Sequence, residues 1–206
     1  MSVSGSIAHI VDDDPAVRES LALLLEVRGI DARAWPDASS FLAGCDFTTP
    51  GCVVLDLRMP GISGSELQAE LVRRDVPMPI LIVTAHGDVA AARAAFRAGA
   101  IDFIEKPIDP DTLVAAVEDA LARGTALRES AARTEQARRK IEALTARERQ
   151  VVELTVSGRH NREIASQLGI SARTVEVYKA RALDKLGIQR IPDLVRLTMR
   201  SKGESP

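Results

Sequence analysis

The chain contains few of the residues and segments that mark extracellular, membrane-bound or ATP-binding proteins. Only two of its 206 residues are cysteines, Cys45 and Cys52, and they show neither metal-ligand spacing nor a partnering histidine cluster. No apolar run approaches membrane-spanning length, and the start of the chain, MSVSGSIAHIVDDD, lacks the basic stretch and apolar core of a secretory signal. A glycine-rich phosphate loop of the Walker type is also missing. We therefore expect a cytoplasmic protein with reduced thiols that has no membrane segment and does not bind ATP itself.

Charge is distributed unevenly along the chain, although the net charge is only −2. Residues 1–124 carry 10 basic and 19 acidic side chains, whereas residues 145–206 carry 12 basic and 7 acidic ones. Such an asymmetry suggests two domains with different partners, and a basic domain is typical of nucleic-acid binding. We expect a first domain over residues 1–124, a helical linker over 125–143 and a second domain over 144–206.

Short apolar runs alternate with helical patterns through the first 120 residues. The run from Cys52 to Leu55 is bounded by glycine and by Asp56, which is typical of a fully buried central strand. Five strands alternating with five helices predict an α/β fold with a doubly wound five-stranded parallel sheet. The strands are expected at residues 6–11, 31–35, 52–55, 79–83 and 101–104.

The helices of this first domain are indicated by caps and by apolar spacing. Asp14 followed by proline predicts a helix start, with an N-cap and proline at the first helical position. The segment 64–74 is predicted to be helical, with Leu67, Leu71 and Val72 turned inward.

Polar side chains follow most of the predicted strands. Right-handed crossovers bring the carboxyl ends of parallel strands to one edge of the sheet, where Asp12, Asp13, Asp56, Thr84 and Lys106 would meet. Clustered carboxylates repel one another, and oxygen-only ligands favour Mg²⁺ over Zn²⁺ as the cation that relieves this repulsion. A carboxylate beside Mg²⁺ and a lysine is suited to attack a phosphoryl group in line. The phosphoryl group must then arrive from another molecule.

Four motifs carry a specific resemblance. IVDDD, LDLRMPG, VTAHGD and DFIEKP occur in this order and spacing, and residues 5–124 resemble the receiver domain of two-component response regulators. The resemblance implies a flavodoxin-like (CheY-like) fold and phosphorylation of Asp56 by a sensor histidine kinase. It also implies Mg²⁺ (or Mn²⁺) bound by Asp13, Asp56 and the backbone carbonyl of Arg58, with Asp12 helping through water.

The same resemblance implies further residue roles. Thr84 would be the switch hydroxyl, and Lys106 would be the phosphate-binding lysine, before a cis peptide bond to the following proline. Phe103 stands at the position of the switch aromatic and has no hydroxyl, so packing would drive any rotamer switch there. The histidines have simpler expected roles, His9 as a packed or edge residue of the first strand and His86 as a solvated loop side chain.

Residues 109–140 contain almost no helix breaker apart from Gly124. Their Ala, Glu, Arg and Gln residues favour helix. We expect a long solvated helix or a partly helical linker with a break near Gly124 or Thr125. The apolar positions do not hold a strict heptad, which disfavours a coiled coil.

The basic tail shows a helix-turn-helix pattern. Thr145 and Glu148 predict a capping box at the start of a helix. A short helix from Asn161 and a third helix over 172–186, joined by a tight glycine-containing turn, form the motif, and a fourth helix is expected over 192–199. LTARERQVVEL, NREIASQLGIS and RTVEVYKARALDKLGI together resemble the LuxR-type DNA-binding domain.

The third helix of this tail has two distinct faces. Val175, Tyr178, Ala182 and Leu186 share one face and are expected to pack inward. On the opposite side, Val177 can meet a thymine methyl and Glu176 can accept a hydrogen bond from cytosine. Basic side chains at the flanks are expected to contact phosphates or base edges. The expected DNA-binding residues are Arg173, Thr174, Glu176, Val177, Lys179, Arg181 and Lys185.

The complete chain resembles FixJ-type response regulators of the NarL/LuxR class. The resemblance implies that phosphorylation of Asp56 exposes a dimer surface, and that the homodimer binds double-stranded promoter DNA. Such a protein regulates transcription by RNA polymerase, and we expect activation and no enzymatic turnover. Two alternatives remain: a constitutive, phosphorylation-independent DNA-binding regulator, and a Mg²⁺-dependent aspartyl phosphotransferase. Such enzymes usually carry a second acid two residues after the nucleophile, where this chain has Arg58.

Overall fold

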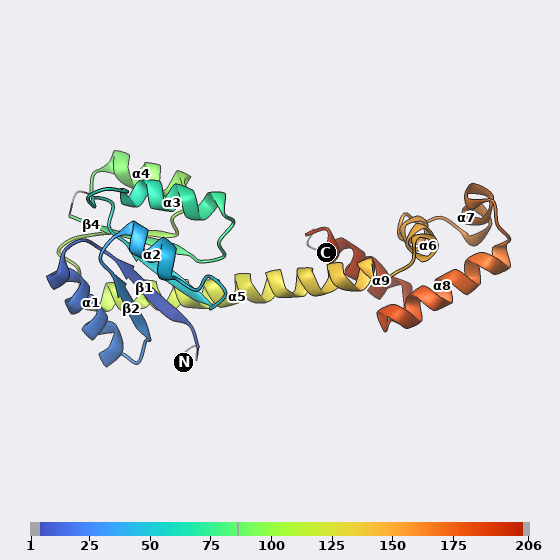
Figure 1. The fold of residues 1–206 in the computed structure, drawn as a ribbon, viewed down its shortest axis with the longest axis horizontal. Helices are drawn as coiled ribbons and strands as arrows, with labels where there is room; N and C mark the ends of the chain where they lie inside the picture. Colours follow the sequence, from blue (N-terminus) through green and yellow to red (C-terminus); the bar gives the residue numbers. More distant parts are fainter. Residues whose placement is uncertain (1–4, 86, 204–206) are drawn as a thin grey trace. The chain divides into compact units, whose positions relative to one another are not determined.

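The computed structural model describes residues 5–85 and 87–203, so the prediction for His86 lies outside the described residues. The chain divides into two compact units between Arg128 and Glu129, a point within the expected linker. The first unit combines a sheet with helices, and the second is helical (Figure 1). In the described part of the chain, we find no helix with the length and apolar character needed to span a bilayer.

Five parallel strands form one sheet in the order β2-β1-β3-β4-β5, which confirms the predicted doubly wound fold. The order reverses between β1 and β3, and ligands of such sheets bind at the carboxyl ends of the strands on either side of this point. All five residues of β3 are buried, as expected for a central strand. The strands are β1 (Ile7–Val11), β2 (Ala32–Trp35), β3 (Gly51–Leu55), β4 (Ile80–Thr84) and β5 (Asp102–Glu105), each end within one residue of its predicted position.

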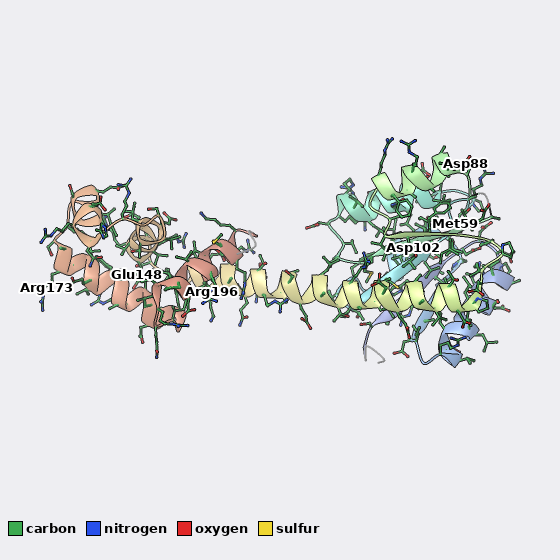
Figure 2. All side chains as sticks on the ribbon, turned by 180° about the vertical axis from the view of Figure 1, so that it is seen from behind. Met59, Asp88, Asp102, Glu148, Arg173 and Arg196 are labelled. Atoms are coloured by element: carbon green, nitrogen blue, oxygen red, sulfur yellow. The ribbon has the colours of Figure 1, made fainter. Side chains whose placement is uncertain are left out.

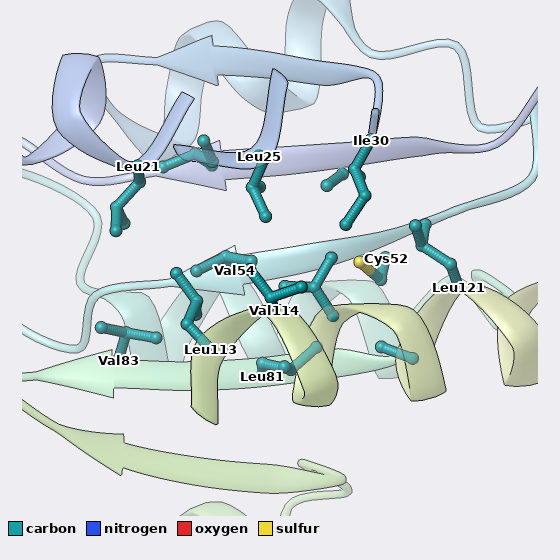
Figure 3. Close-up of a cluster of buried hydrophobic side chains, with 14 of the residues drawn as sticks. Leu21, Leu25, Ile30, Cys52, Val54, Leu81, Val83, Leu113, Val114 and Leu121 are labelled. Carbon is teal, nitrogen blue, oxygen red and sulfur yellow. The ribbon is translucent and has the colours of Figure 1, made fainter. Parts of the chain in front are cut away.

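Helices cover both faces of this sheet. Successive residues of a strand point to opposite faces, so Val54 joins a core with α1 and α5 (Figure 3). Val53 and Leu55 join the second core with α2, α3 and α4. The helices are α1 (Pro15–Val27), α2 (Ala38–Gly44), α3 (Gly64–Arg73), α4 (Val89–Arg97) and α5 (Pro110–Glu142).

The inward face of α3 differs from the prediction at one position. Leu67 and Leu71 are buried as expected, but Val72 is 57% exposed. Gln68 takes the inward place, and its side-chain amide donates a 2.9 Å hydrogen bond to the Ala95 carbonyl of α4. The face follows the spacing of residues 67, 68 and 71, so residue 72 turns away from the core. Gln68, bonded to α4, therefore occupies the inward position that was expected for Val72.

The predicted break near Gly124 does not occur, because α5 runs without interruption from Pro110 to Glu142. Gly124 is instead a point of close approach between this helix and the start of β3. A Cβ atom at Gly124 would collide with the Gly51 carbonyl oxygen and lie 3.2 Å from Pro79. Glycine is therefore needed here for helix–strand packing rather than to end a helix.

The second unit has the predicted helix-turn-helix order. Thr145 and Glu148 form the expected capping box at the start of α6. Gly169 adopts the left-handed conformation (φ 65°) that closes α7 and opens the turn to the next helix. The helices are α6 (Ala146–Val156), α7 (Asn161–Leu168), α8 (Ala172–Leu186) and α9 (Ile191–Ser201). Their inward residues form two small apolar clusters, one of them containing Val175 of α8 and the other Ala182 and Leu186.

Candidate functional site

Asp56 directly follows β3 and lies at the carboxyl edge of the sheet. Its backbone N–H donates to the Val11 carbonyl at 2.9 Å, so it extends the pairing of β3 with β1. The residue is only 7% exposed. The loop after it returns close to its backbone, since the Gly64 N–H donates to the Leu57 carbonyl and a Cβ at Gly64 would collide with the Asp56 carbonyl oxygen. The strand and this tight return hold the carboxylate in one place.

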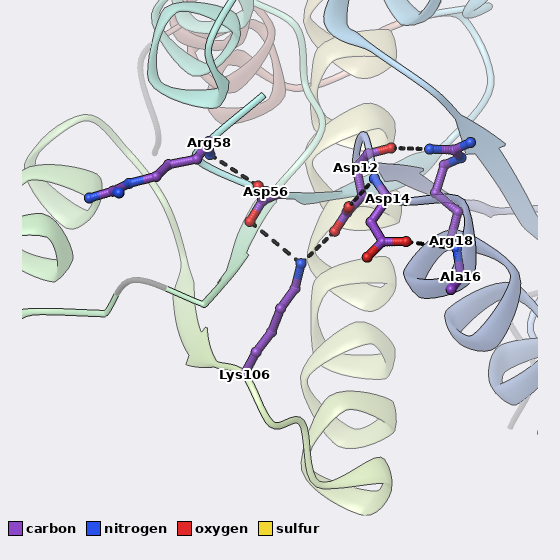
Figure 4. Close-up of polar contacts among 7 residues, drawn as sticks. All are labelled: Asp12, Asp14, Ala16, Arg18, Asp56, Arg58 and Lys106. Carbon is purple, nitrogen blue, oxygen red and sulfur yellow. Dashed lines mark hydrogen bonds and ion pairs between the residues drawn. The ribbon is translucent and has the colours of Figure 1, made fainter. Parts of the chain in front are cut away.

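The Lys106 ammonium lies between two carboxylates. Its Nζ is 2.7 Å from Asp12 Oδ2 and 3.6 Å from Asp56 Oδ1. The Arg58 backbone N–H donates to Asp56 Oδ2 at 3.1 Å, while the Arg58 side chain points away from the pocket (Figure 4). The structure thus brings together Asp12, Asp56 and Lys106 from β1, β3 and β5, as strand alternation predicted.

The electrostatic environment of Asp56 has opposing contributions. Burial raises the pKa of its carboxyl group, and repulsion by Asp12 acts in the same direction. The Lys106 charge and hydrogen bonds from the Arg58 N–H and the Thr84 hydroxyl lower the pKa, and the net direction is upward. A desolvated carboxylate with a raised pKa is a better nucleophile than a fully solvated one.

Thr84 and Phe103 come from neighbouring strands. Thr84 ends β4 and is fully buried, and its carbonyl accepts a 2.9 Å hydrogen bond from the Lys106 N–H. Phe103 pairs in register with Ile82 and packs against the core on the α2–α4 face. The peptide bond from Lys106 to Pro107 is cis, as the resemblance implied. These positions are compatible with the expected roles, which stay predictions.

The oxygen atoms of the pocket suit a hard cation. Asp12 and Asp56 are buried, whereas Asp13 is exposed next to them. Carboxylates and a backbone carbonyl are the ligands that Mg²⁺ prefers, so this donor set fits the expected ion. Among the described residues, no three His, Cys, Asp or Glu side chains are already arranged around a common metal position. The Lys106 ammonium pairs with both buried carboxylates, Asp12 and Asp56.

One contact of this pocket was missed by sequence reasoning. Nη1 of Arg18, in α1, donates a 2.6 Å hydrogen bond to the Asp12 backbone carbonyl (Figure 4). A helical side chain leans toward the helix N-terminus. An arginine four residues after the Asp14 cap could therefore have been placed near the end of β1 from the sequence.

The candidate DNA-binding residues lie on α8. Val175, Ala182 and Leu186 are buried, and Tyr178 is partly buried in the cluster that contains Val175, which confirms the predicted inward face. On the other side, Val177 is 43% exposed. Arg173 is exposed near the start of α8 (Figure 2). Glu176 and Arg181 are also exposed, while Thr174 and Lys179 are half-buried.

Lys185 has a partner inside its own domain. Its Nζ is 2.7 Å from Oε2 of Glu148, whose side chain is 4% exposed. Figure 2 labels Glu148, which lies on α6. The Glu148 carboxylate also accepts from the Thr145 backbone N–H at 2.8 Å in the capping box of α6. Hydrogen bonds from Lys185 and Thr145 lower the pKa of Glu148 to about 2. Lys185 therefore links α8 to α6, and a DNA contact by Lys185 stays a prediction.

Comparison with known proteins gives matches for both parts of the chain. The family described as the response regulator receiver domain matches residues 8–118, and the luxR family of bacterial regulatory proteins matches residues 142–198. The transcriptional regulatory protein FixJ of Azorhizobium caulinodans is 46% identical, over 93% of this chain and 90% of the relative. FixJ of Bradyrhizobium diazoefficiens is 40% identical, over 98% of each chain.

Solved structures give the same result. The response regulator StyR matches with a TM-score of 0.83 and 38% identity, covering 96% of this chain and all of its own. Full-length FixJ from B. japonicum matches with a TM-score of 0.56 and 40% identity, covering 98% of this chain and 99% of its own.

Proposed function

Because this chain belongs to the FixJ-type two-component response regulators, with a receiver domain and a luxR-type DNA-binding domain, we propose that phosphorylation of Asp56 controls its binding to promoter DNA. The observation that supports this most directly is the geometry of the pocket. A buried carboxylate lies 3.6 Å from a lysine ammonium, beside a second carboxylate, at the carboxyl edge of the sheet. The phosphoryl donor would be a histidine of a sensor kinase.

In the proposed reaction, an Asp56 carboxylate oxygen attacks phosphorus in line as the bond between phosphorus and the donor histidine nitrogen breaks. Bound Mg²⁺ (or Mn²⁺) would supply positive charge next to the transferred oxygens, held by Asp12, Asp13, Asp56 and the Arg58 carbonyl. Lys106 already contacts both buried carboxylates, and its ammonium group would shift to contact a phosphoryl oxygen. In this proposal the pocket takes up one phosphoryl group and loses it by hydrolysis, and the chain acts as a regulator rather than as a turnover enzyme.

The phosphoryl group would act on the rest of the receiver through Thr84. This hydroxyl bonds to the Asp56 carboxylate, and a phosphoryl oxygen offers it a new acceptor further from β3. Movement of the end of β4 would change the packing of Phe103, α4 and β5. We propose that this rearrangement exposes a surface for homodimerisation, and that the dimer contacts RNA polymerase as an activator in the cytoplasm.

The DNA-binding domain would read its site with α8. We propose the receiver over residues 1–124, a linker over 125–143 and the DNA-binding domain over 144–206. Exposed Val177 and Glu176 would contact bases, and the other proposed contacts would position α8 on phosphates. Those other residues are Arg173, Thr174, Lys179, Arg181 and Lys185.

The phosphorylation proposal is tested with acetyl phosphate and Mg²⁺, read by intact mass and size-exclusion chromatography. The wild-type chain should gain one phosphoryl group and shift toward a dimer, and Asp56→Asn should do neither. Asp46→Asn is a matched control, because Asp46 is an exposed carboxylate away from the pocket. An adduct of equal yield in Asp56→Asn would exclude Asp56 as the acceptor.

The DNA proposal is tested by fluorescence anisotropy with promoter fragments across a salt series. Replacing a basic side chain that contacts phosphate should lower the slope of log K against log salt by about 1. We expect this for Arg181→Gln, whereas Arg123→Gln, in α5, should leave the slope unchanged. Equal slopes for both variants would argue against a phosphate contact by Arg181.

A further inference from the structure

We propose that Arg18 is a positioning residue of the acidic pocket, whose guanidinium fixes the turn that presents Asp13 to a divalent cation. This inference rests on the proposed function, since it assumes that the pocket binds Mg²⁺. Arg18 does not touch the phosphoryl group in this account. It acts through the backbone of Asp12.

The Asp12 carbonyl is a buried acceptor at the place where the sheet ends. The Asp12 N–H still donates to the Trp35 carbonyl of β2, but β2 stops at that residue. Asp12 is 3% exposed, and a buried carbonyl requires a donor. Arg18 Nη1 provides one at 2.6 Å from the first turns of α1.

The remaining oxygen atoms of Asp12 are also held. Oδ1 accepts from the Asp14 backbone N–H at 2.9 Å, and Oδ2 accepts from Lys106 at 2.7 Å (Figure 4). The Asp12 carbonyl and the Asp13 N–H belong to one planar peptide unit. Fixing the carbonyl therefore fixes the backbone direction at Asp13. The Asp13 side chain is exposed and makes no hydrogen bond to a described residue, so the backbone alone sets the direction of its Cα–Cβ bond.

Charge and positioning predict opposite effects of removing Arg18. Arg18 brings positive charge to the Asp12 end of the pocket, so its loss should strengthen cation binding if charge alone mattered. If the guanidinium positions the turn, its loss should weaken cation binding. A third possibility is that Arg18 only satisfies a buried carbonyl, in which case stability falls and cation affinity does not change. The sign of the change in Mg²⁺ affinity separates these accounts.

The experiment is calorimetric titration of the full-length, unphosphorylated protein with MgCl₂. Arg18→Gln should weaken Mg²⁺ binding by about 10-fold or more, the usual effect of removing a group that orients a metal ligand. Arg18→Lys keeps the charge and one donor and should restore part of the affinity. Arg28→Gln is the control, because Arg28 follows α1 and pairs with Asp111 at 2.6 Å on the surface. It removes the same charge without touching the turn.

A dissociation constant for Arg18→Gln that is tighter than wild type, or within about twofold of it, would overturn the proposal. If Arg18→Gln does not fold, as judged by Trp35 fluorescence, the Mg²⁺ affinity of Arg18→Lys is the test. Wild-type Mg²⁺ affinity in Arg18→Lys would also overturn the proposal. Acetyl phosphate labelling of wild type and Asp56→Asn runs in parallel. If the wild-type chain is not labelled but Arg18→Gln still binds Mg²⁺ more weakly than wild type, the proposed function is contradicted and the role of Arg18 stands.

Discussion

His9 lies in the interior of the receiver, where its neighbours fix its protonation state. The residue is 1% exposed in β1, and its Nδ1 accepts a 3.2 Å hydrogen bond from the Trp35 indole N–H. An indole can only donate, so Nδ1 carries no proton and the neutral ring holds its proton on Nε2, 3.7 Å from the Cys45 sulfur. Burial, with a smaller contribution from Arg33, lowers the pKa of His9 to about 4. His9 is thus a packed residue, as the sequence suggested.

This pKa predicts an acid-sensitive receiver. Between pH 6.5 and 4 the unfolded chain binds a proton at His9 and the folded chain does not, so stability falls as the pH falls through this window. The loss should reach about 3 kcal/mol at the lower end. Denaturant unfolding followed by Trp35, the single tryptophan of the chain, measures it.

His9→Gln should flatten the pH dependence in that window. His160→Gln is the control, because His160 is exposed at the cap of α7 in the other unit. An unchanged slope in His9→Gln would show that other groups cause the acid sensitivity.

Gly124 offers a second residue-level prediction. Alanine favours an α-helix over glycine by about 1 kcal/mol. At Gly124, however, the new methyl group would collide with the Gly51 carbonyl oxygen, a backbone atom of β3 that cannot move aside easily. Overpacking costs about 1–3 kcal/mol, so Gly124→Ala should lower or at best preserve receiver stability. Ala126→Gly, at an exposed position of the same helix, should lower stability only by the difference in helix propensity. A clear gain in receiver stability for Gly124→Ala would contradict the predicted collision.

At the scale of elements, an ion pair joins α6 to α8 in addition to the apolar contacts between these helices. Glu148 is 3% exposed, caps α6 and accepts from Lys185 of α8 at 2.7 Å. The Lys185 side chain is 44% exposed, so removing the Glu148 charge costs mainly the hydrogen bonds of the cap and this ion pair. The contact fastens the last turns of α8 to the start of α6 and turns the Lys185 ammonium toward its own domain.

Glu148→Gln should therefore destabilise the second unit more than Glu153→Gln, an exposed change on the same helix. The pKa of Glu148 is lowered to about 2 in the folded chain. Its contribution is then fully present above about pH 4.5 and is lost as the pH falls toward 2. Calorimetric unfolding of the second unit at neutral and acidic pH measures both effects. Equal unfolding temperatures for the two variants would show that Glu148 does not stabilise this unit.

On the scale of the whole molecule, the first compact unit extends beyond the residues that match the receiver family. The match ends at residue 118, whereas the unit ends at Arg128. Leu121 is buried, Thr125 Oγ1 lies 3.2 Å from Ser6 Oγ, and Arg128 donates to the Phe47 carbonyl at 3.1 Å. Residues 125–128, at the start of the proposed linker, therefore still contact the receiver, and Leu121 belongs to its core.

This extension predicts the behaviour of fragments. A fragment of residues 1–128 should be more stable than one of residues 1–118, because burial of Leu121 alone contributes about 1.5–3 kcal/mol. A fragment of residues 1–124 should fall between them, since it keeps Leu121 and loses the contacts of Thr125 and Arg128. Denaturant midpoints from Trp35 fluorescence test this order, and equal midpoints would show that α5 beyond residue 118 adds nothing.

The sequence by itself determined the order of the strands along the chain, several helix caps, and the meeting of Asp12, Asp56 and Lys106 at one edge of the sheet. These features follow from local patterns: apolar runs of strand length, Asp14 before proline, the Thr145 capping box, and strand ends that a parallel sheet must bring to one edge. Motifs with fixed spacing then indicated both families before any contact was known. The errors came where a local pattern had two meanings, as for Gly124 and Val72.

Only the tertiary structure decided which side chains face one another. A glycine within a helical pattern can break a helix or admit a neighbouring strand, and the approach of Gly51 settled this at Gly124. The pairing of Lys185 with Glu148 joins residues 37 positions apart in the chain, and Arg18 reaches a carbonyl left without a strand partner where β2 ends. Such contacts depend on the packing of separate elements, which no local spacing specifies.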